Sequence, residues 1–312
     1  MVAASLSSHT QLDGFEGDRS IPFGGNSVQH GTAVFDGIRC YDTPRGPALF
    51  RLREHAERLL NSARTIGIEH DYSFSGLLAA ITRAAADSRL ADCYVRPVLF
   101  ARDPYIGVDL HAFRFTLGVE VWPMPPSSQA ESRLDISPWR RPAKSSFPPT
   151  VKATGTYAVS ALARTAAVTA GFDDAIQLDA LSGRVAEATT ANVFLVKDGR
   201  LRTPWTADGL LPGITRDSVL RLAALIGLEA DEGPVEIADL AAADEVFLTG
   251  TASGLVSVPA IGEWRYPSHG PVFAALSRAY LDAVTGRRFT ELGWCQLVPS
   301  AVPSPDHGES AH

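Results

Sequence analysis

Lysine is scarce in this sequence, although positive charge is not. The chain has 28 basic residues, and the lysines among them are Lys144, Lys152 and Lys197, which leaves 25 arginines (28 minus 3). Arginine is a permanent cation, whereas a lysine amine can lose its proton and attack a carbonyl carbon. A lysine in a chain that otherwise uses arginine is therefore a candidate nucleophile, and the surroundings of each one decide the matter.

Features of several other protein classes are also lacking. No apolar run approaches the roughly 18 to 20 residues that cross a bilayer. A net charge of −7 without a Lys/Arg block argues against nucleic acid as a partner. The first eighteen residues contain no lysine, no arginine and no apolar stretch, so we expect no signal peptide and a cytoplasmic location. These absences are typical of a soluble globular protein and argue against membrane-spanning, nucleic-acid-binding and secreted proteins.

Cysteine is rare as well. Cys40, Cys93 and Cys295 are odd in number, far apart and outside any Cys-x-x-Cys pattern. This spacing argues against both a disulfide framework and a zinc site. We therefore expect reduced, mostly buried thiols and no bound metal.

The length of 312 residues predicts roughly two domains of about 150 residues each. The strongest break in composition is "PMPPSSQAES", which has no helical or strand periodicity. We predict an α/β protein with a small N-terminal domain over residues 1–122, a linker over 123–132 and a larger domain over 133–298. The tail over 299–312, rich in Pro and Ser, is predicted to be disordered.

Periodicity and turn residues predict the elements around the candidate site. Two strands flank the turn at 42–46, and a helix with apolar residues at helical spacing ends at Gly67. The other predicted elements are a helix over 75–89, strands in "CYVRPVLFA" and "FRFTLGVEVW", a strand near 133–137, a helix over 157–170, and a helix that follows "LLPG" and ends at Gly227.

Lys152 differs from the other two lysines in its local sequence. It stands just before a predicted helix, among the small residues Ala153, Thr154 and Gly155, which let other groups approach its side chain. Lys144 in a loop and Lys197 in a predicted hairpin tip fit the surface role that most lysines have. A lysine that forms an imine must spend time neutral, which requires partial burial or a nearby positive charge.

Four other features could serve the same ligand as Lys152. Glu187 ends a predicted strand, Arg58 lies on an amphipathic helix, and "LLPGITRD" describes a helix N-terminus with free N–H groups, which is a phosphate cradle in kind. "TGTAS" is a second cluster of small hydroxyl residues. Each feature alone is an ordinary surface charge, cap or turn. Together they match the needs of pyridoxal 5'-phosphate: an amine, a partner for the ring nitrogen and an anion site.

With these residues the sequence resembles the class IV aminotransferases, the fold type IV group of pyridoxal-phosphate enzymes, and most closely the branched-chain amino acid aminotransferases among them. The resemblance covers nearly the whole chain outside both tails. It is carried by "VFDGIR", "FRLREHAERL", "YVRPVLF", "VKATGTY", "EATTANVFLVKDG", "LLPGITRD" and "DEVFLTGTA". It implies a cofactor site between the two domains and at least a homodimer.

The resemblance also implies roles at matching positions. Lys152 would hold the cofactor as a Schiff base and move the substrate proton, Tyr157 would bond the cofactor's phenolic oxygen, and Glu187 would pair with its ring nitrogen. The phosphate would be held by Arg58, Ile214, Thr215 and Thr251. The substrate would meet Gly250, Ala252 and Tyr94 at its α-carboxylate, Arg96 at the distal carboxylate of glutamate, Phe35 and Trp122 in an apolar pocket, and His30 in a wall formed by the neighbouring subunit.

The predicted activity is transfer of an amino group from an L-amino acid, branched-chain (Leu, Ile or Val), to 2-oxoglutarate. Three departures bear on the substrate: His30 replaces the usual tyrosine, and "KATGTY" and "EATTAN" replace the commoner "KAGGNY" and "EGxxEN". A class IV aminotransferase with a specialised biosynthetic substrate therefore stays open. So do a lyase of the aminodeoxychorismate type and a cofactor-free binding module.

Overall fold

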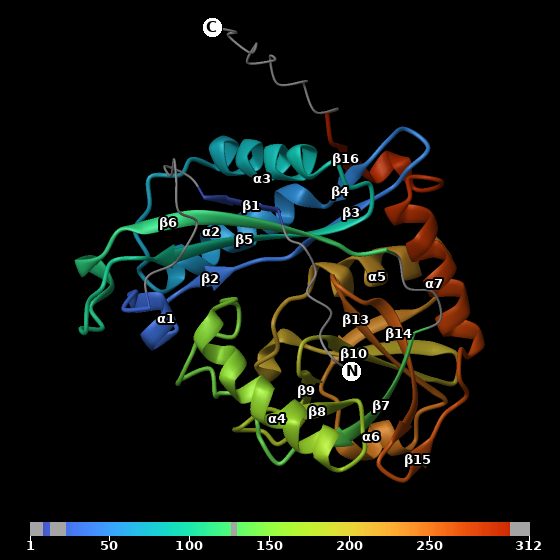
Figure 1. Ribbon diagram of the computed structural model, residues 1–312. Coiled ribbons are helices and arrows are strands. Elements are labelled where there is room, and N and C mark those ends of the chain that lie inside the picture. Colours follow the sequence, from blue (N-terminus) through green and yellow to red (C-terminus); the bar gives the residue numbers. More distant parts are fainter. Residues whose placement is uncertain (1–8, 13–22, 126–129, 300–312) are drawn as a thin grey trace, which may run out of the picture.

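A computed structural model describes residues 9–12, 23–125 and 130–299, with the side chains of 9–12 left out. Two β-sheets and the helices packed on them make up the molecule (Figure 1). In the view of Figure 1 the first sheet, with helix α3 above it, lies over the second sheet, which α4 and α7 flank. Within the described ranges, no helix combines the length and the apolar character that a bilayer crossing requires.

The first sheet is antiparallel and is built mainly from the N-terminal third of the chain. Its strand order is β1 (His9–Leu12), β6 (Phe115–Pro123), β5 (Cys93–Ala101), β3 (Ile38–Tyr41), β4 (Ala48–Phe50) and β16 (Cys295–Leu297), and β2 (Val34–Phe35) pairs with β5. The short helix α1 (Asn26–His30) precedes strand β2 in the chain. Strands β5 and β6 pair along their whole length, which lines up their side chains in fixed rows.

Two helices cover one face of this sheet. In α2 (Leu52–Thr65) the buried residues Leu52, Ala56, Leu59 and Ala63 recur every three or four positions, which gives the helix one apolar side. The helix α3 (Phe74–Ser88) begins at Ser73, whose hydroxyl accepts a hydrogen bond from the backbone N–H of Gly76. Both helices share one apolar core with the first sheet. The opposite side of α2 is thereby free to present polar residues toward the second sheet.

The second sheet is mixed and carries the remaining helices. Its strand order is β12 (Ala230–Gly233), β11 (Arg200–Pro204), β10 (Asn192–Lys197), β13 (Glu245–Gly250), β14 (Gly254–Ile261), β7 (Glu131–Ile136), β8 (Asp174–Leu178) and β9 (Val185–Ala188), with β15 (Trp264–Arg265) on β14. The helices are α4 (Tyr157–Thr169), α5 (Ile214–Leu225), α6 (Ile237–Ala241) and α7 (Pro271–Val284). Separate apolar cores fill its two faces.

Most elements predicted from periodicity are confirmed. The helix expected over 75–89 is α3, the two long strands are β5 and β6, and the helix expected over 157–170 ends one residue earlier. The helices α1, α6 and α7 were not predicted. For α7 a signal existed, because Gly270 and Pro271 open a run whose buried residues keep helical spacing. The cysteines are free, with Cys40 and Cys93 buried and Cys295 partly buried.

The end of the chain returns to the first sheet. Strand β16 pairs antiparallel with β4, so the last residues of the predicted larger domain extend the sheet of the N-terminal region. Strand β6 ends at Pro123 and β7 begins at Glu131, which leaves the predicted linker between the sheets. Its residues 126–129 and the predicted tail from residue 300 lie outside the described residues. The division into two domains stays a prediction.

Candidate active site

One cavity brings together residues from both parts of the molecule. Its walls include one helix packed on the first sheet, the segment before α4, and strands and turns of the second sheet. Eight of the residues predicted from the sequence line it: Arg58, Lys152, Tyr157, Glu187, Ile214, Thr215, Gly250 and Thr251. They are far apart in the chain, so the fold assembles what the sequence presents as separate motifs.

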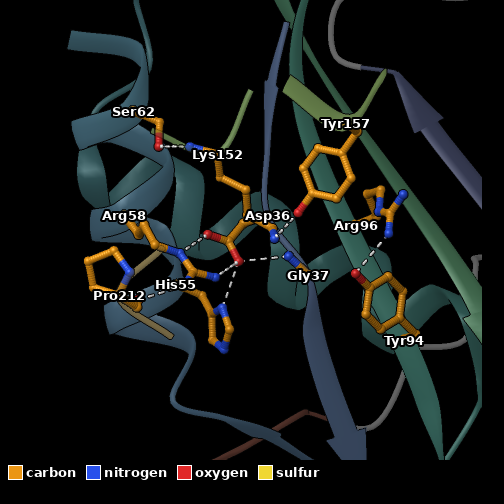
Figure 2. Close-up of polar contacts among 10 residues, drawn as sticks. All are labelled: Asp36, Gly37, His55, Arg58, Ser62, Tyr94, Arg96, Lys152, Tyr157 and Pro212. Carbon is orange, nitrogen blue, oxygen red and sulfur yellow. Dashed lines mark hydrogen bonds and ion pairs between the residues drawn. The ribbon is translucent and has the colours of Figure 1, made fainter. Parts of the chain in front are cut away.

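Lys152 is held at both its backbone and its side chain. Its backbone N–H donates to Ser62 Oγ on α2 at 3.1 Å, and its carbonyl accepts from the N–H of Phe35 at 3.0 Å. Its Nζ donates to the hydroxyl of Tyr157 at 2.6 Å (Figure 2) and lies 5.0 Å from the centre of the Phe35 ring. The amine is therefore aimed at one place between the two sheets.

The surroundings of Lys152 favour its neutral form. Burial, and next the positive charge of Arg58, lower the pKa of the amine to about 8. With that pKa roughly one amine in ten is neutral at pH 7, against roughly one in three thousand at the ordinary value. By contrast, Lys144 is exposed, and Lys197 is an exposed partner of Asp244. Lys152 alone of the three lysines is thus prepared to act as a nucleophile.

Arg58 is fixed by a buried carboxylate that the sequence motifs did not reveal. Asp36 accepts two hydrogen bonds from Arg58, at 2.7 and 2.8 Å, and lies 2.7 Å from both the Nδ1 of His55 and the N–H of Gly37 (Figure 2). Burial would raise the pKa of Asp36, but Arg58 and His55 outweigh it and hold this pKa well below its usual range. A third nitrogen of Arg58 donates to the carbonyl of Pro212 at 3.2 Å. The guanidinium is thereby directed to the start of α5.

Glu187 is buried and has a partner at each oxygen. Asn192 Nδ2 donates to Oε2 at 3.0 Å, the backbone N–H of Leu211 donates to the same oxygen at 3.3 Å, and Arg141 Nε lies 3.1 Å from Oε1. Burial raises the pKa of Glu187, and Arg141 acts in the opposite direction. Arg141 and Asn192 line the cavity but were not predicted. Asn192 lies inside the quoted "EATTAN" motif, whereas Arg141 lies in an irregular stretch without periodicity.

An anion site is available at the start of α5. Gly213 precedes the helix and offers no side chain as a cap, so the first N–H groups of α5 lack a side-chain acceptor there. A Cβ at Gly213 would lie 1.9 Å from Asn192 Oδ1, so a larger residue would have to displace the Asn192 side chain. Thr215 is buried at the first turn, and Thr249 Oγ1 is buried with no hydrogen-bond partner in the described part of the chain. These donors converge on the cavity that Arg58 faces.

The predicted substrate residues form an aromatic group on the first sheet. The Arg96 guanidinium carbon lies 4.8 Å from the ring centre of Phe35, 5.2 Å from that of Tyr94 and 5.7 Å from that of Trp122. Arg96 also donates to the Tyr94 hydroxyl at 2.9 Å (Figure 2). The ring of Phe35 packs 5.0 Å from that of Tyr157, which joins this group to Lys152. An apolar wall with one cation at its centre therefore borders the amine.

Ala252 and His30, the remaining predicted residues, lie in different settings. Ala252 is tied to the first sheet by Arg39, a buried cation missed in the sequence, whose Nη1 donates to the Ala252 carbonyl at 3.0 Å. His30 is not brought into the cavity of its own chain. It is exposed on α1, with Nδ1 3.2 Å from Asn26 Nδ2. Among the described residues no group of His, Cys, Asp and Glu could hold a metal ion.

Residues 33–261 match the family described as amino-transferase class IV. This chain belongs to the class IV aminotransferase family. It is 35% identical over 284 residues to the branched-chain-amino-acid aminotransferase of Escherichia coli (strain K12), covering 88% of this chain and 91% of that one. The reaction class and the α/β fold predicted from the sequence are thereby confirmed.

This chain is also similar to solved structures of branched-chain aminotransferases. A branched-chain aminotransferase of Thermoproteus uzoniensis with norvaline gives a TM-score of 0.89 at 32% identity, over 94% of this chain and all of that chain (100%). The T.th. branched-chain amino acid aminotransferase complexed with N-(5'-phosphopyridoxyl)-L-glutamate gives 0.88 at 35% identity, over 95% and 99%. A class IV aminotransferase fold therefore extends over nearly the entire chain.

Proposed function

We propose that this chain is a pyridoxal-phosphate-dependent aminotransferase that transfers the amino group of a branched-chain L-amino acid to 2-oxoglutarate. The observation that carries the proposal is the cavity in which the amine of Lys152, with its lowered pKa, faces Glu187 on one side and the N-terminus of α5 with Arg58 on another. An amine, a carboxylate and an anion site in one cavity are what this cofactor requires.

The residues present fit the cofactor. Arg58, the N–H groups of Ile214 and Thr215, and the hydroxyl of Thr251 would hold its phosphate. The unpartnered Thr249 Oγ1 supports this assignment, because a buried hydroxyl without a partner is costly until a ligand supplies one. Once bound, pyridoxal phosphate supplies a ring that takes up the electron pair left when the substrate loses its α-proton.

The remaining roles concern protons. Lys152 Nζ would take the α-proton from the substrate and return it, since its pKa of about 8 lets both protonation states exist near neutral pH. Tyr157 stays a phenol in this range, because burial and the nearby Glu187 charge raise its pKa to about 12. Its hydroxyl can therefore hold the amine in place. Glu187 would face the ring nitrogen, whose positive charge it would stabilise.

The aromatic group on the first sheet supports the choice of substrates. Phe35 and Trp122 would receive an apolar side chain, and Arg96 would receive the distal carboxylate of the acceptor, 2-oxoglutarate. The α-carboxylate, common to every substrate, would lie at the Gly250 to Ala252 turn next to Tyr94. The T. uzoniensis and T.th. relatives carry norvaline and a glutamate derivative, one apolar and one acidic side chain.

We also propose a homodimer. An exposed apolar cluster lies beside His30, with Phe23 and Ile106 exposed by 86% and 88% and Val28 and Val108 also exposed. The cluster comes from two chain segments, residues 23–28 and 106–108. The Asn26 side chain joins them, since its Nδ2 donates to the carbonyls of residues 105 and 107. Large exposed apolar clusters on an ordered framework are typical of protein interfaces. A cytoplasmic location stays a prediction from the sequence.

The test of the proposed function combines an assay with a chemical trap. Leucine and 2-oxoglutarate are mixed with the purified chain, and glutamate formation is measured. Borohydride reduction of the chain with pyridoxal phosphate should trap an adduct at Lys152. Lys152→Ala should abolish both results, whereas Lys197→Ala, which removes an exposed lysine, should change neither. A panel of other amino donors, and a pyruvate assay with aminodeoxychorismate, would reveal a specialised substrate or a lyase instead.

A further inference from the structure

Arg51 stands at the junction of β4 and α2 in an unusual state. Its side chain is buried, with 4% exposed, and its backbone φ of 53° lies in the left-handed region. Residues with a side chain seldom adopt this conformation, and it persists where the surroundings hold it in place. Neither the predicted site nor the cavity lining includes Arg51. A buried arginine in a strained conformation outside the site calls for a physical explanation.

The contacts of Arg51 lead to the first turn of α5. Its Nη1 donates to the carbonyl of Ile214 at 3.2 Å, to Asp217 Oδ2 at 2.6 Å and to Ser218 Oγ at 2.9 Å. Its Nε donates to Glu54 Oε1 at 2.7 Å, back on α2. One guanidinium therefore joins the first turns of two helices that belong to different sheets.

The C-terminal segment closes the other side of Arg51. Its backbone N–H donates to the carbonyl of Trp294 at 2.7 Å, and its guanidinium carbon lies 4.9 Å from the centre of the Trp294 ring. This aromatic cover and the buried acceptors Ile214 O and Ser218 Oγ fix the orientation of the guanidinium. The link between α2 and α5 is thus rigid rather than a surface ion pair.

The proposed phosphate site needs this link, because its parts come from the same two helices. Arg58 is on α2, two turns beyond Arg51, and the N–H groups of Ile214 and Thr215 begin α5. Arg58 itself reaches across by one hydrogen bond of 3.2 Å to Pro212. Arg51 adds three hydrogen bonds from the start of α2 to α5. A shift of α5 against α2 would separate the donors that must meet one phosphate.

Charge gives Arg51 a second effect on the same site. Asp217 brings a carboxylate to the first turn of α5, where it would repel a phosphate bound at that helix end. Arg51 and Arg221 both bind its Oδ2, at 2.6 and 3.0 Å. Arg51 is the buried one of the two, so solvent screens its charge less.

We propose that Arg51 is a positioning residue for the phosphate end of the cofactor site: it sets α2 against α5 and offsets the charge of Asp217, without touching the cofactor. This inference rests on the proposed use of pyridoxal phosphate. It makes a specific claim, because a residue that only stabilises the fold would affect all ligands alike. Arg51 must affect binding of the phosphate group and spare binding of the ring and aldehyde.

The experiment compares two ligands that differ only in the phosphate. The full chain is freed of cofactor, and pyridoxal phosphate and pyridoxal are titrated separately by absorbance. For Arg51→Met the affinity for pyridoxal phosphate should fall about tenfold or more, equivalent to about 1.4 kcal/mol. The affinity for pyridoxal should change by less than about twofold. Arg51→Lys, which keeps the charge but cannot reach several acceptors at once, should give an intermediate loss.

Controls separate this inference from the proposed function and from a folding defect. Arg202→Met removes an arginine whose partner, Asp231, is likewise a carboxylate but exposed, and it should leave both affinities unchanged. If Arg51→Met does not fold, the same ratio is read from Arg51→Lys. Equal losses for both ligands, or no loss for either, would overturn the role of Arg51. Failure of the unaltered chain to bind pyridoxal phosphate would instead overturn the proposed function.

Discussion

The surroundings of the proposed cofactor and of the proposed substrate differ in how completely the protein satisfies its own charges. Around the cofactor, Glu187 on the second sheet has three protein partners, and Asp36 on the first sheet holds Arg58 through two hydrogen bonds. Around the substrate, Arg39 and Arg96 on the first sheet have no carboxylate within ion-pair distance in the described part of the chain. Each also has a buried Nε without a hydrogen-bond partner there.

This difference matches the difference between a cofactor that stays bound and substrates that are exchanged in each turnover. Buried charges are stable only when paired, so the paired charges around the cofactor can keep a fixed position with or without a substrate. Arg39 and Arg96 instead keep a buried Nε that an anionic substrate could engage. A resident cofactor suits the first arrangement and substrates with carboxylates suit the second. Variants around the cofactor should therefore change the chemical step, and variants around the substrate should change substrate affinity.

The largest expected effect concerns the pH dependence of Lys152. Burial and Arg58 both disfavour the charged ammonium, so its pKa of about 8 makes the amine reactive at lower pH than an ordinary lysine. Between pH 6 and pH 8 the neutral fraction should rise about fiftyfold. The rate at which pyridoxal forms a borohydride-trapped adduct with the cofactor-free chain should rise likewise.

Arg58→Met tests the cause of this shift. Removing the neighbouring positive charge should move the midpoint of the pH profile upward, toward the ordinary lysine value. A midpoint near the ordinary value of 10.5 in the unaltered chain would contradict the lowered pKa. A profile that Arg58→Met leaves in place would mean that burial alone prepares the amine.

The next effect concerns Glu187 and should appear in turnover. Glu187→Gln keeps the shape and one acceptor oxygen for Asn192 and Leu211, but it removes the charge that would stabilise a protonated ring nitrogen. A charge-assisted hydrogen bond is worth roughly 1.5 to 3 kcal/mol, and each 1.36 kcal/mol is about tenfold in rate. We expect kcat to fall at least tenfold while the cofactor remains bound, as followed by absorbance. Near-normal turnover would remove Glu187 from the mechanism.

Arg39 is the matching test around the substrate. It donates to the carbonyl of Ala252 at 3.0 Å and to that of Met124 at 2.7 Å, and so holds the turn where the α-carboxylate would lie. In Arg39→Met these carbonyls lose their donor, at a cost of about 1 to 3 kcal/mol each. The Michaelis constants for leucine and for 2-oxoglutarate should both rise about tenfold, because both substrates carry an α-carboxylate.

The same variant distinguishes substrate positioning from general damage. Cofactor affinity should stay within about twofold, since the hydrogen bonds of Arg39 go to the carbonyls of Ala252 and Met124 and not to a residue proposed to hold the cofactor. Arg39→Lys, which retains the charge, should give Michaelis constants between those of the unaltered chain and those of Arg39→Met. A rise in only one Michaelis constant, or loss of the cofactor, would contradict the division between cofactor and substrate surroundings.

Sequence reasoning located residues of the cavity where a motif is local in the chain, while their roles stay predictions. Lys152 and Tyr157 lie five residues apart, and "LLPG" marks a helix start by its own residues, so both motifs could be read without a fold. Asp36, Arg141 and Arg39 gain their contacts from residues far away in the chain, and no local pattern predicts such contacts. The pairing of β16 with β4 is equally long-range. Most elements and the local motifs of the cavity were thus predictable, and the buried charge network was not.

The smallest expected effect, and the most selective, concerns Arg96. In Arg96→Leu the cation among three aromatic rings is replaced by an apolar side chain, so the Michaelis constant for 2-oxoglutarate should rise about fivefold more than that for leucine. Glu120 provides a control of opposite sign. Glu120 on β6 lies opposite Arg96 on β5 in the strand register. Burial raises the pKa of Glu120, and the charge of Arg96 opposes the rise.

If Arg96 receives the distal carboxylate, the negative charge of Glu120 on the neighbouring strand works against that carboxylate. Glu120→Gln should then lower the Michaelis constant for 2-oxoglutarate and leave that for leucine unchanged, because leucine brings no distal charge. Equal changes for both substrates in either variant would place the distal carboxylate elsewhere. Opposite changes for 2-oxoglutarate alone would show that one pair of facing residues sets the balance between acidic and apolar substrates.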